Sequence, residues 1–232
     1  DTGPELWCSD GTADGTRLVA NLALQSNGSI ALGKPARAGN FLFFAADDGV
    51  TVNALWRTDG TPAGTIKLTG LNGDPGGAMS AFTDVQGVLF FLRTTGPAEL
   101  WRSDGTVAGT YRVHQFAAAF WAEEYARLTA AGSHLFFFDS DPLTGMELWK
   151  SDGTEAGTVM VKSISPNTSS STPIYLTNVN GSLFFVASEG FGGNGRELWK
   201  SDGTEQGTTL VKNIAAGSTS SFPKQLVNVN GT

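Results

Sequence analysis

Residues 5–12 read Glu-Leu-Trp-Cys-Ser-Asp-Gly-Thr, and variants of this phrase return four more times in the 232-residue chain. The copies begin at residues 5, 54, 99, 147 and 197, so successive copies are 49, 45, 48 and 50 positions apart. Each continues with two variable residues and a second Gly-Thr, as in Glu155-Ala156-Gly157-Thr158. A period of about 40 to 50 residues with strand-like content is typical of the blades of a β-propeller.

Alignment of the copies predicts four short strands in each repeat, rich in β-branched or aromatic residues and bounded by turn residues. In the last full repeat these strands are residues 174–179, 183–187, 197–200 and 209–212. Asn180-Gly181 predicts a two-residue hairpin between the first two strands, because both residues tolerate a positive φ. Helical periodicity is weak everywhere, with residues 116–127 as the one candidate.

Apolar residues are adjacent within the predicted strands, and neighbours in a strand point to opposite faces of its sheet. Leu198-Trp199 is one such pair, and the second strands carry another: Phe43-Phe44, Phe90-Phe91, Phe136-Phe137 and Phe184-Phe185. Small sheets stacked around an axis bury both faces. We therefore expect an all-β fold, a five-bladed β-propeller of four-stranded antiparallel blades, in one domain spanning residues 1–232.

The two ends of the sequence predict parts of one shared blade. Residues 1–20 supply its third and fourth strands and residues 225–232 its first, whereas no second strand is present. Because an unpaired strand edge is a hazard, we expect a longer natural chain, or strand exchange with another segment or copy at this incomplete blade.

Composition argues against several classes of partner and cofactor. The net charge is −7, which argues against nucleic acid and anionic membrane as partners and also suits plain solubility. No apolar run has the length of a membrane span, so membrane insertion is not expected, and no signal peptide is visible. The single cysteine, Cys8, stands where other copies have a basic residue, and the two histidines lack companions at metal-ligand spacing. No cofactor is expected; Asp139-x-Asp141 suggests calcium but lacks further ligand spacing.

The phrase Glu-Leu-Trp-x-x-Asp-Gly-Thr resembles the repeat that defines the bacterial ELWxxDGT repeat proteins. The resemblance covers essentially the whole chain, although copy two has Ala54 and Thr58 in place of Glu and Ser, and copy one has Cys8. It implies a β-propeller-like repeat in an extracellular or cell-surface protein. It implies no reaction.

Ligand binding is expected at the end of the propeller where the repeats differ, formed by the second-to-third-strand loops and the inter-blade linkers. The most divergent linker, residues 116–127, suggests an aromatic platform with two carboxylates, suited to a sugar ring, and the alternative is local packing of one longer linker. Phe191 and the pair Asp47-Asp48 are further variable positions. The candidate ligand-binding residues are Phe120, Trp121, Glu123, Glu124, Tyr125 and Phe191.

The motif residues are interpreted as structural. Their aspartates are expected to form turns, with one ligand site per blade as the alternative; they are Asp10, Asp59, Asp104, Asp152 and Asp202. The motif glutamates are expected to pair with bases such as Lys162 and Lys212.

Three hypotheses of function follow. The leading one is a non-catalytic binding or scaffold module at a bacterial surface, with a glycan or another surface protein as partner. The second is a propeller-type glycoside hydrolase, which needs two facing carboxylates; the sequence offers Asp84 as a strand acid and Glu123 and Glu124 beside another strand. The third is a purely structural segment of a larger filament or adhesin.

Overall fold

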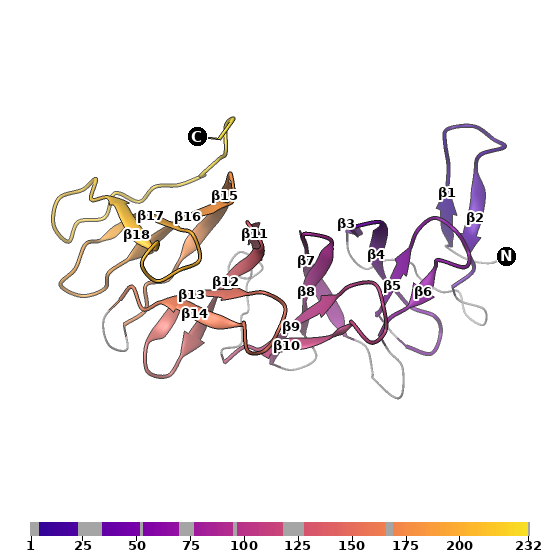
Figure 1. The fold of residues 1–232 in the computed structure, drawn as a ribbon, viewed down its shortest axis with the longest axis horizontal. Coiled ribbons are helices and arrows are strands. Elements are labelled where there is room, and N and C mark those ends of the chain that lie inside the picture. The colour runs from indigo at the N-terminus through magenta and orange to yellow at the C-terminus, as the bar shows by residue number, and fades with distance from the viewer. Residues whose placement is uncertain are drawn as a thin grey trace. The chain divides into compact units, whose positions relative to one another are not determined.

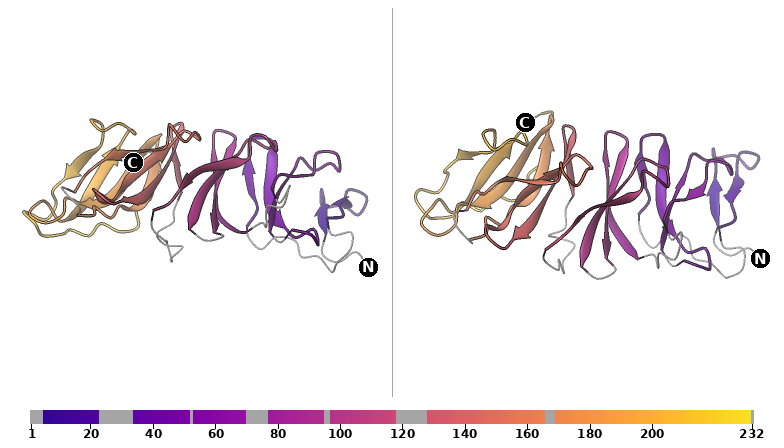
Figure 2. Two further views of the ribbon diagram at one scale, coloured as in Figure 1. Left: turned by 90° about the horizontal axis from the view of Figure 1, so that it is seen from below. Right: turned by 60° about the horizontal axis from the view of Figure 1, so that its bottom comes forward.

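A computed structural model of the chain describes residues 5–22, 34–51, 53–69, 77–94, 97–117, 128–165 and 169–231. This part of the chain is all-β, with eighteen strands and no helix (Figures 1 and 2). None of its segments is therefore a helix long and apolar enough to cross a membrane. The chain divides into two compact units, Asp1–Arg112 and Val113–Thr232.

The strands form five antiparallel sheets, and within each sheet the hydrogen-bonded neighbours are strands that are consecutive in the sequence. The first sheet has two strands, β1 (Leu6–Cys8) and β2 (Arg17–Ala20). The other four are meanders of four strands: β3 (Ala36–Ala38), β4 (Phe41–Ala46), β5 (Ala54–Thr58) and β6 (Ile66–Lys67); β7 (Ala78–Val85), β8 (Val88–Thr94), β9 (Ala98–Ser103) and β10 (Tyr111–Gln115); β11 (Thr129–Ala131), β12 (His134–Asp141), β13 (Gly145–Ser151) and β14 (Val159–Lys162); and β15 (Ile174–Val179), β16 (Ser182–Ser188), β17 (Arg196–Ser201) and β18 (Thr209–Lys212).

The architecture is thus all-β and β-propeller-like, and the predicted four-stranded repeat is confirmed in four of the five sheets. The first sheet differs because it contains only the motif strand and the strand after it. Residues 225–231, expected to supply the first strand of the blade shared with residues 1–20, are not in a strand, so that expectation is wrong. A first strand needs the hydrogen bonds of a second one to form a ladder, and no second strand lies beside these residues in the described part of the chain.

The hairpins form for the reason that the sequence suggests. Between β15 and β16, Val179 lies opposite Ser182, and the two turn residues Asn180 and Gly181 have φ of 51° and 86°. Two consecutive positive φ angles match the right-handed twist of the flanking strands. The turn therefore sets the register of the whole sheet.

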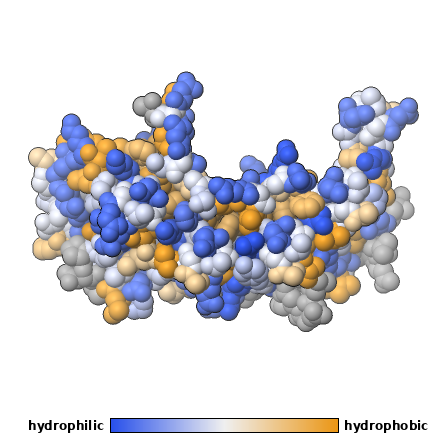
Figure 3. Space-filling view, viewed as in Figure 1, coloured by the Kyte–Doolittle hydropathy of each residue, from blue (hydrophilic) through white to orange (hydrophobic). Residues whose placement is uncertain are grey.

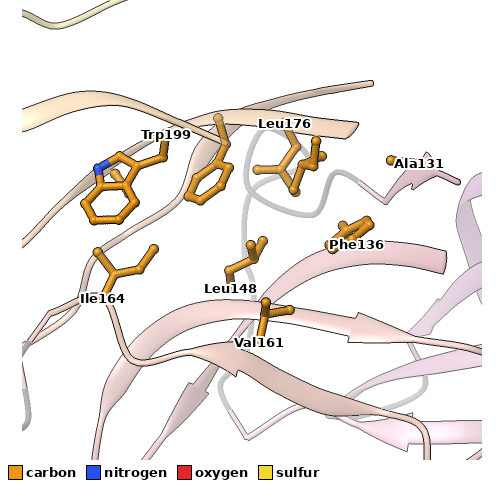
Figure 4. Close-up of a cluster of buried hydrophobic side chains, with 10 residues drawn as sticks. Ala131, Phe136, Leu148, Val161, Ile164, Leu176 and Trp199 are labelled. Carbon is orange, nitrogen blue, oxygen red and sulfur yellow. The ribbon is translucent and has the colours of Figure 1, made fainter. Parts of the chain in front are cut away.

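Both faces of the sheets are used for packing, since adjacent residues of β12 such as Phe136 and Phe137 are both buried, and Figure 4 shows one cluster between two sheets of the second unit. Phe136, Leu148, Val161 and Ile164 lie on one side of this cluster, and Leu176 and Trp199 of the next sheet lie on the other. Leu183 and Phe185 of that sheet belong to the same cluster. Burial of each such side chain contributes about 1.5–3 kcal/mol relative to exposure. The exception among the motif tryptophans is Trp7 of the two-stranded sheet, which is 58% exposed, compared with 4% for Trp199.

Candidate functional site

The motif turn has the same hydrogen bonds in all five copies, and copy four illustrates it. Asp152 Oδ1 accepts hydrogen bonds from the Thr154 amide (2.8 Å) and from Thr154 Oγ1 (2.7 Å). The Gly157 amide donates to Thr154 Oγ1, and Thr158 Oγ1 donates to the Thr154 carbonyl. The Thr154 hydroxyl and amide lower the pKa of Asp152. The structure thus places the motif aspartates inside turns, each engaged by the threonine two residues later.

The second glycine of the motif is required by the same turn. A Cβ atom on Gly157 would lie 2.1 Å from Asp152 Oδ1, and the other four copies show equally close approaches. Only a residue without a side chain leaves room for the carboxylate there. The first glycine of the motif is required for a different reason. Gly153 has a φ of 92°, which glycine adopts readily and residues with a side chain adopt only at a cost.

The motif turns also hold neighbouring sheets together. Arg57 stacks over the Phe41 ring at 3.8 Å and donates from Nε to the carbonyl of Gly105 in the next motif turn (2.6 Å). In the second unit, Lys162 Nζ donates to the Thr208 carbonyl of the next turn (2.9 Å). The end of the sheets at which the motif turns lie therefore connects each of these sheets to the next one in the sequence.

The motif glutamates do not pair with Lys162 or Lys212 in the contacts described, and that expectation is wrong for Glu147. Its carboxylate is buried and accepts from the amides of Ile164 and Ser165 and from Ser171 Oγ. Burial raises the pKa of Glu147 despite these hydrogen bonds. A carboxylate fits here because the linker turns back over the sheet and leaves amides without strand partners.

Glu197 repeats this arrangement in the last sheet, where it accepts from the amides of Ile214 and Ala215 and from Ser221. Burial works to raise its pKa, but the hydrogen bonds outweigh burial and lower it. In copy three, Glu99 instead accepts from Trp101 Nε1 and Arg112. The motif glutamate therefore anchors local structure in each of these copies.

The opposite end of the sheets carries the second-to-third-strand loops, and three of them share an unpredicted feature. Each presents one apolar side chain to solvent: Val50 is 89% exposed, Leu143 is 78% exposed and Phe191 is 99% exposed. Loops on a rigid scaffold are the usual place for recognition. Exposed apolar tips at corresponding places in three repeats make each of these loops a candidate functional site.

In each of these loops an acidic side chain accepts hydrogen bonds from backbone amides of the same loop. Asp48 accepts from the amides of Val50 (3.0 Å) and Thr51 (2.7 Å). Asp141 accepts from the amides of Leu143 (2.7 Å) and Thr144 (3.2 Å).

The Phe191 loop is closed in a related way. Glu189 Oε2 accepts from both the amide (2.9 Å) and the side-chain nitrogen (2.7 Å) of Asn194. The Glu189 amide donates to the Asn194 carbonyl, so main chain and side chain close the loop together. The apolar tips are therefore held by defined hydrogen bonds, which limits the entropy lost when a ligand binds them.

The sequence-predicted sites are distributed as follows. Phe191 lies at its loop tip, whereas the aromatic platform lies outside the described residues: Phe120, Trp121, Glu123, Glu124 and Tyr125. Two residues close to the start of this linker, His114 and Ala117, both contact Asp139. Asp139 is buried, accepts from the Ala117 amide, and lies 2.6 Å from His114 Nε2.

His114 lies among aromatic rings that the sequence did not connect to it. Its ring centroid is 5.4 Å from that of Phe116, 5.5 Å from that of Trp149 and 6.1 Å from that of Phe137. The sequence feature that could have indicated a partner for His114 is Asp139, because the matching position of the last repeat is Ala187. A buried acid at a position that is alanine in the last repeat requires a partner.

Three acidic residues considered for calcium or catalysis, Asp84, Asp139 and Asp141, are engaged in local contacts, whereas Glu123 and Glu124 lie outside the described residues. Asp139 and Asp141 accept from the groups named above, and Asp84 accepts from the Gly87 amide of its hairpin (2.7 Å). Among the described residues, no three His, Cys, Asp or Glu side chains are grouped so that they could hold a metal ion. A shallow pocket of about 330 Å³ lies at the motif end, lined by Arg37, Phe41 and Asp59 among others. Its polar groups Arg37 and Asp59 already hydrogen-bond within their own turns.

No protein-family model matches the chain, and no curated protein matches it. Among solved structures it is similar to a Mycobacterium tuberculosis puromycin-hydrolyzing peptidase, with 12% identity over 88% of this chain and 31% of that chain and a TM-score of 0.46. It is also similar to TolB from Acinetobacter baumannii (16% identity, 84% and 45% coverage, TM-score 0.38) and to a puromycin hydrolase mutant complexed with PGG (20% identity, 80% and 30% coverage, TM-score 0.40). The chain spans less than half the length of each of these proteins. At such TM-scores the likeness supports no conclusion about activity or ligand.

Proposed function

We propose that this chain is a non-catalytic, β-propeller-like binding module of a bacterial surface or secreted protein, and that its ligand is a carbohydrate. The observation that carries the proposal is the set of braced loops with exposed apolar tips, above all the fully exposed ring of Phe191. An exposed aromatic ring on a closed loop gives a large, rigid contact area at low entropic cost. The surface setting follows the resemblance to ELWxxDGT repeat proteins.

The proposal includes the arrangement of the blades and of the divergent linker. The five sheets are the blades of one β-propeller ring. Phe120, Trp121, Glu123, Glu124 and Tyr125 add an aromatic and acidic surface on the loop side of this ring. Small-angle scattering tests the ring, since a measured radius of gyration well above about 17–18 Å, the value for a compact chain of this length, would contradict it.

A glycan array probed with the purified chain tests the carbohydrate ligand. Phe191→Ala and Trp121→Ala are expected to lose binding. Val107→Ala is the matched control, because Val107 is also an exposed apolar residue but lies in a motif turn at the other end of the sheet. If the three variants bind alike, the loop-side site is wrong; if the chain binds no glycan or surface polymer at all, the carbohydrate ligand is wrong.

The structural hypothesis has its own support, since the motif residues described here serve turns and joints. A segment of a filament or adhesin needs those joints and no ligand. The mass of the intact native polypeptide distinguishes this role, because many further repeats favour a filament. Hydrolysis of an aryl glycoside by the purified chain would instead establish a glycosidase and overturn the non-catalytic proposal.

A further inference from the structure

The Leu143 loop (residues 142–144) and the Phe191 loop (residues 189–195) belong to consecutive sheets of the second unit, and one linker residue is hydrogen-bonded beside both. The Ser171 amide donates to the carbonyl of Met146, three residues after Leu143 (3.0 Å). The amide of Ser188, three residues before Phe191, donates to the Ser171 carbonyl (3.1 Å). Two hydrogen bonds and the span of a single residue place the Met146 carbonyl and the Ser188 amide at most about 10 Å apart. The two loops with exposed tips therefore start close together.

The same linker also lies directly against the Phe191 loop. A Cβ atom on Gly190 would lie 2.1 Å from Ser165 Oγ, and Gly190 has a φ of 80°. The backbone conformation and the close approach of the linker therefore both require glycine beside Phe191. Just after the loop, Arg196 donates to the carbonyl (3.2 Å) and to the hydroxyl (2.5 Å) of Thr172. The linker thus fixes the Phe191 loop on both sides of its tip.

Polar groups beside the two tips are available to a ligand. Asp141 Oδ1 accepts from amides of its own loop and Glu189 Oε2 accepts from Asn194, whereas Asp141 Oδ2 and Glu189 Oε1 accept no hydrogen bond from the described residues. Ser170 of the linker is exposed, and its Oγ accepts from the Met146 amide (2.9 Å), so its own O–H is left as a donor. Two carboxylate oxygens accept from hydroxyl groups and repel an anionic ligand.

The Val50 loop of the first unit has the same turn but no such available carboxylate oxygen. Asp48 accepts from the amides of its loop as Asp141 does in the fourth sheet. However, Lys67 Nζ donates to Asp48 Oδ2 (2.6 Å), and the residue that matches Lys67 in the fourth sheet is Met160. The Val50 loop therefore provides a comparison in which the apolar tip is present and the second carboxylate oxygen is occupied.

We infer, on the basis of the function proposed above, that the ligand is a neutral oligosaccharide of at least two sugar units, bound across the Leu143 and Phe191 loops with Ser170 between them. The apolar tips contact the faces of successive sugar rings, and the carboxylates of Asp141 and Glu189 accept from the sugar hydroxyl groups. Figure 3 shows hydrophobic and hydrophilic residues interspersed over the visible face of the second unit, a pattern that suits a ligand with both kinds of group.

An array that carries neutral and uronic-acid glycans, from monosaccharides to longer oligosaccharides, tests the size and charge of the ligand. The purified chain is expected to bind neutral glycans of two or more units at least tenfold more tightly than monosaccharides. Equal affinity for monosaccharides, or a preference for uronic-acid glycans, overturns the inference.

Variants of the second unit distinguish this two-loop site from a site at Phe191 alone. Leu143→Ala and Ser170→Ala are each expected to weaken binding of the best neutral glycan on the array at least fivefold. Asp141→Asn keeps an acceptor for the amides of its loop but replaces the second carboxylate oxygen by a donor, and it is expected to have an effect of the same size. Val50→Ala is the matched control and is expected to change affinity less than twofold. Thermal unfolding of each variant checks that the sheets are intact.

The inference and the proposed function fail with different results. If Phe191→Ala weakens binding and Leu143→Ala and Ser170→Ala do not, the binding module stands and the two-loop site is wrong. An equal loss in Val50→Ala also overturns the two-loop site. If Phe191→Ala leaves binding unchanged, or if no glycan binds, the proposed function and the inference are both wrong.

Discussion

Gly157→Ala tests the explanation of the repeated motif. Gly157 does not have a left-handed φ, so alanine is compatible with its backbone. The new Cβ atom, however, would lie 2.1 Å from Asp152 Oδ1 and 2.2 Å from Asp152 Cγ, far inside van der Waals contact. The carboxylate must therefore rotate away and lose its two hydrogen bonds to Thr154.

The magnitude follows from those two bonds. Each contributes about 0.5–1.5 kcal/mol net, so their loss costs about 2 kcal/mol. Replacing glycine by alanine restricts the unfolded chain and returns about 0.4–1 kcal/mol. We expect Gly157→Ala to lower the free energy of unfolding by about 1–2 kcal/mol, measured by urea denaturation followed by tryptophan fluorescence.

Asp152→Ala provides the control through a double-mutant cycle. Without the carboxylate, the alanine at position 157 meets no obstacle, and only its effect on the unfolded chain remains. Gly157→Ala should therefore stabilise the Asp152→Ala protein by about 0.5 kcal/mol. If it destabilises both backgrounds equally, the contact between glycine and aspartate is not the reason for the conserved spacing of the motif within this chain.

Three further predictions concern the carboxylates and the loop tip. Glu147→Ala should lower the free energy of unfolding by about 3 kcal/mol because it leaves buried amides unpaired, whereas Glu99→Ala should cost less than about 1 kcal/mol; denaturation of both variants checks this. The pKa values of Asp152 and Glu197 are lowered in the folded state, so the stability that these two carboxylates contribute is present above their unfolded pKa and is lost as the pH falls below about 4. The pKa of Glu147 is raised in the folded state, so ionisation of this carboxyl group lowers the stability of the fold as the pH rises above about 4.5. Unfolding free energies between pH 3 and 7 should therefore fall toward acid in the wild type, and fall more steeply in Glu147→Gln. Phe191→Ala should change stability by less than about 0.5 kcal/mol, since its ring makes no buried contact, so unchanged thermal unfolding alongside altered binding separates function from folding.

The candidate site was only partly predictable. Phe191 was visible in the sequence because it interrupts a glycine-rich loop. The exposed Val50 and Leu143 were not, because an apolar residue in a short loop has no sequence pattern that distinguishes a solvent-facing side chain from one folded back onto the sheet. The role of Glu147 was also missed: a glutamate among lysines suggests ion pairing, whereas the unpaired amides that it satisfies exist only once the linker has folded over the sheet.

The sequence by itself determined the repeat, the order of strands and the hairpins, because these depend on contacts between residues close in the chain. Asn180-Gly181 selects its turn and Asp152 closes its loop without help from other sheets. The tertiary structure alone decided which faces are covered and which groups are left for partners. Trp7 and Trp199 stand in phrases that differ at one residue, yet one is exposed and the other buried, because burial depends on which side chains of other sheets pack against the ring.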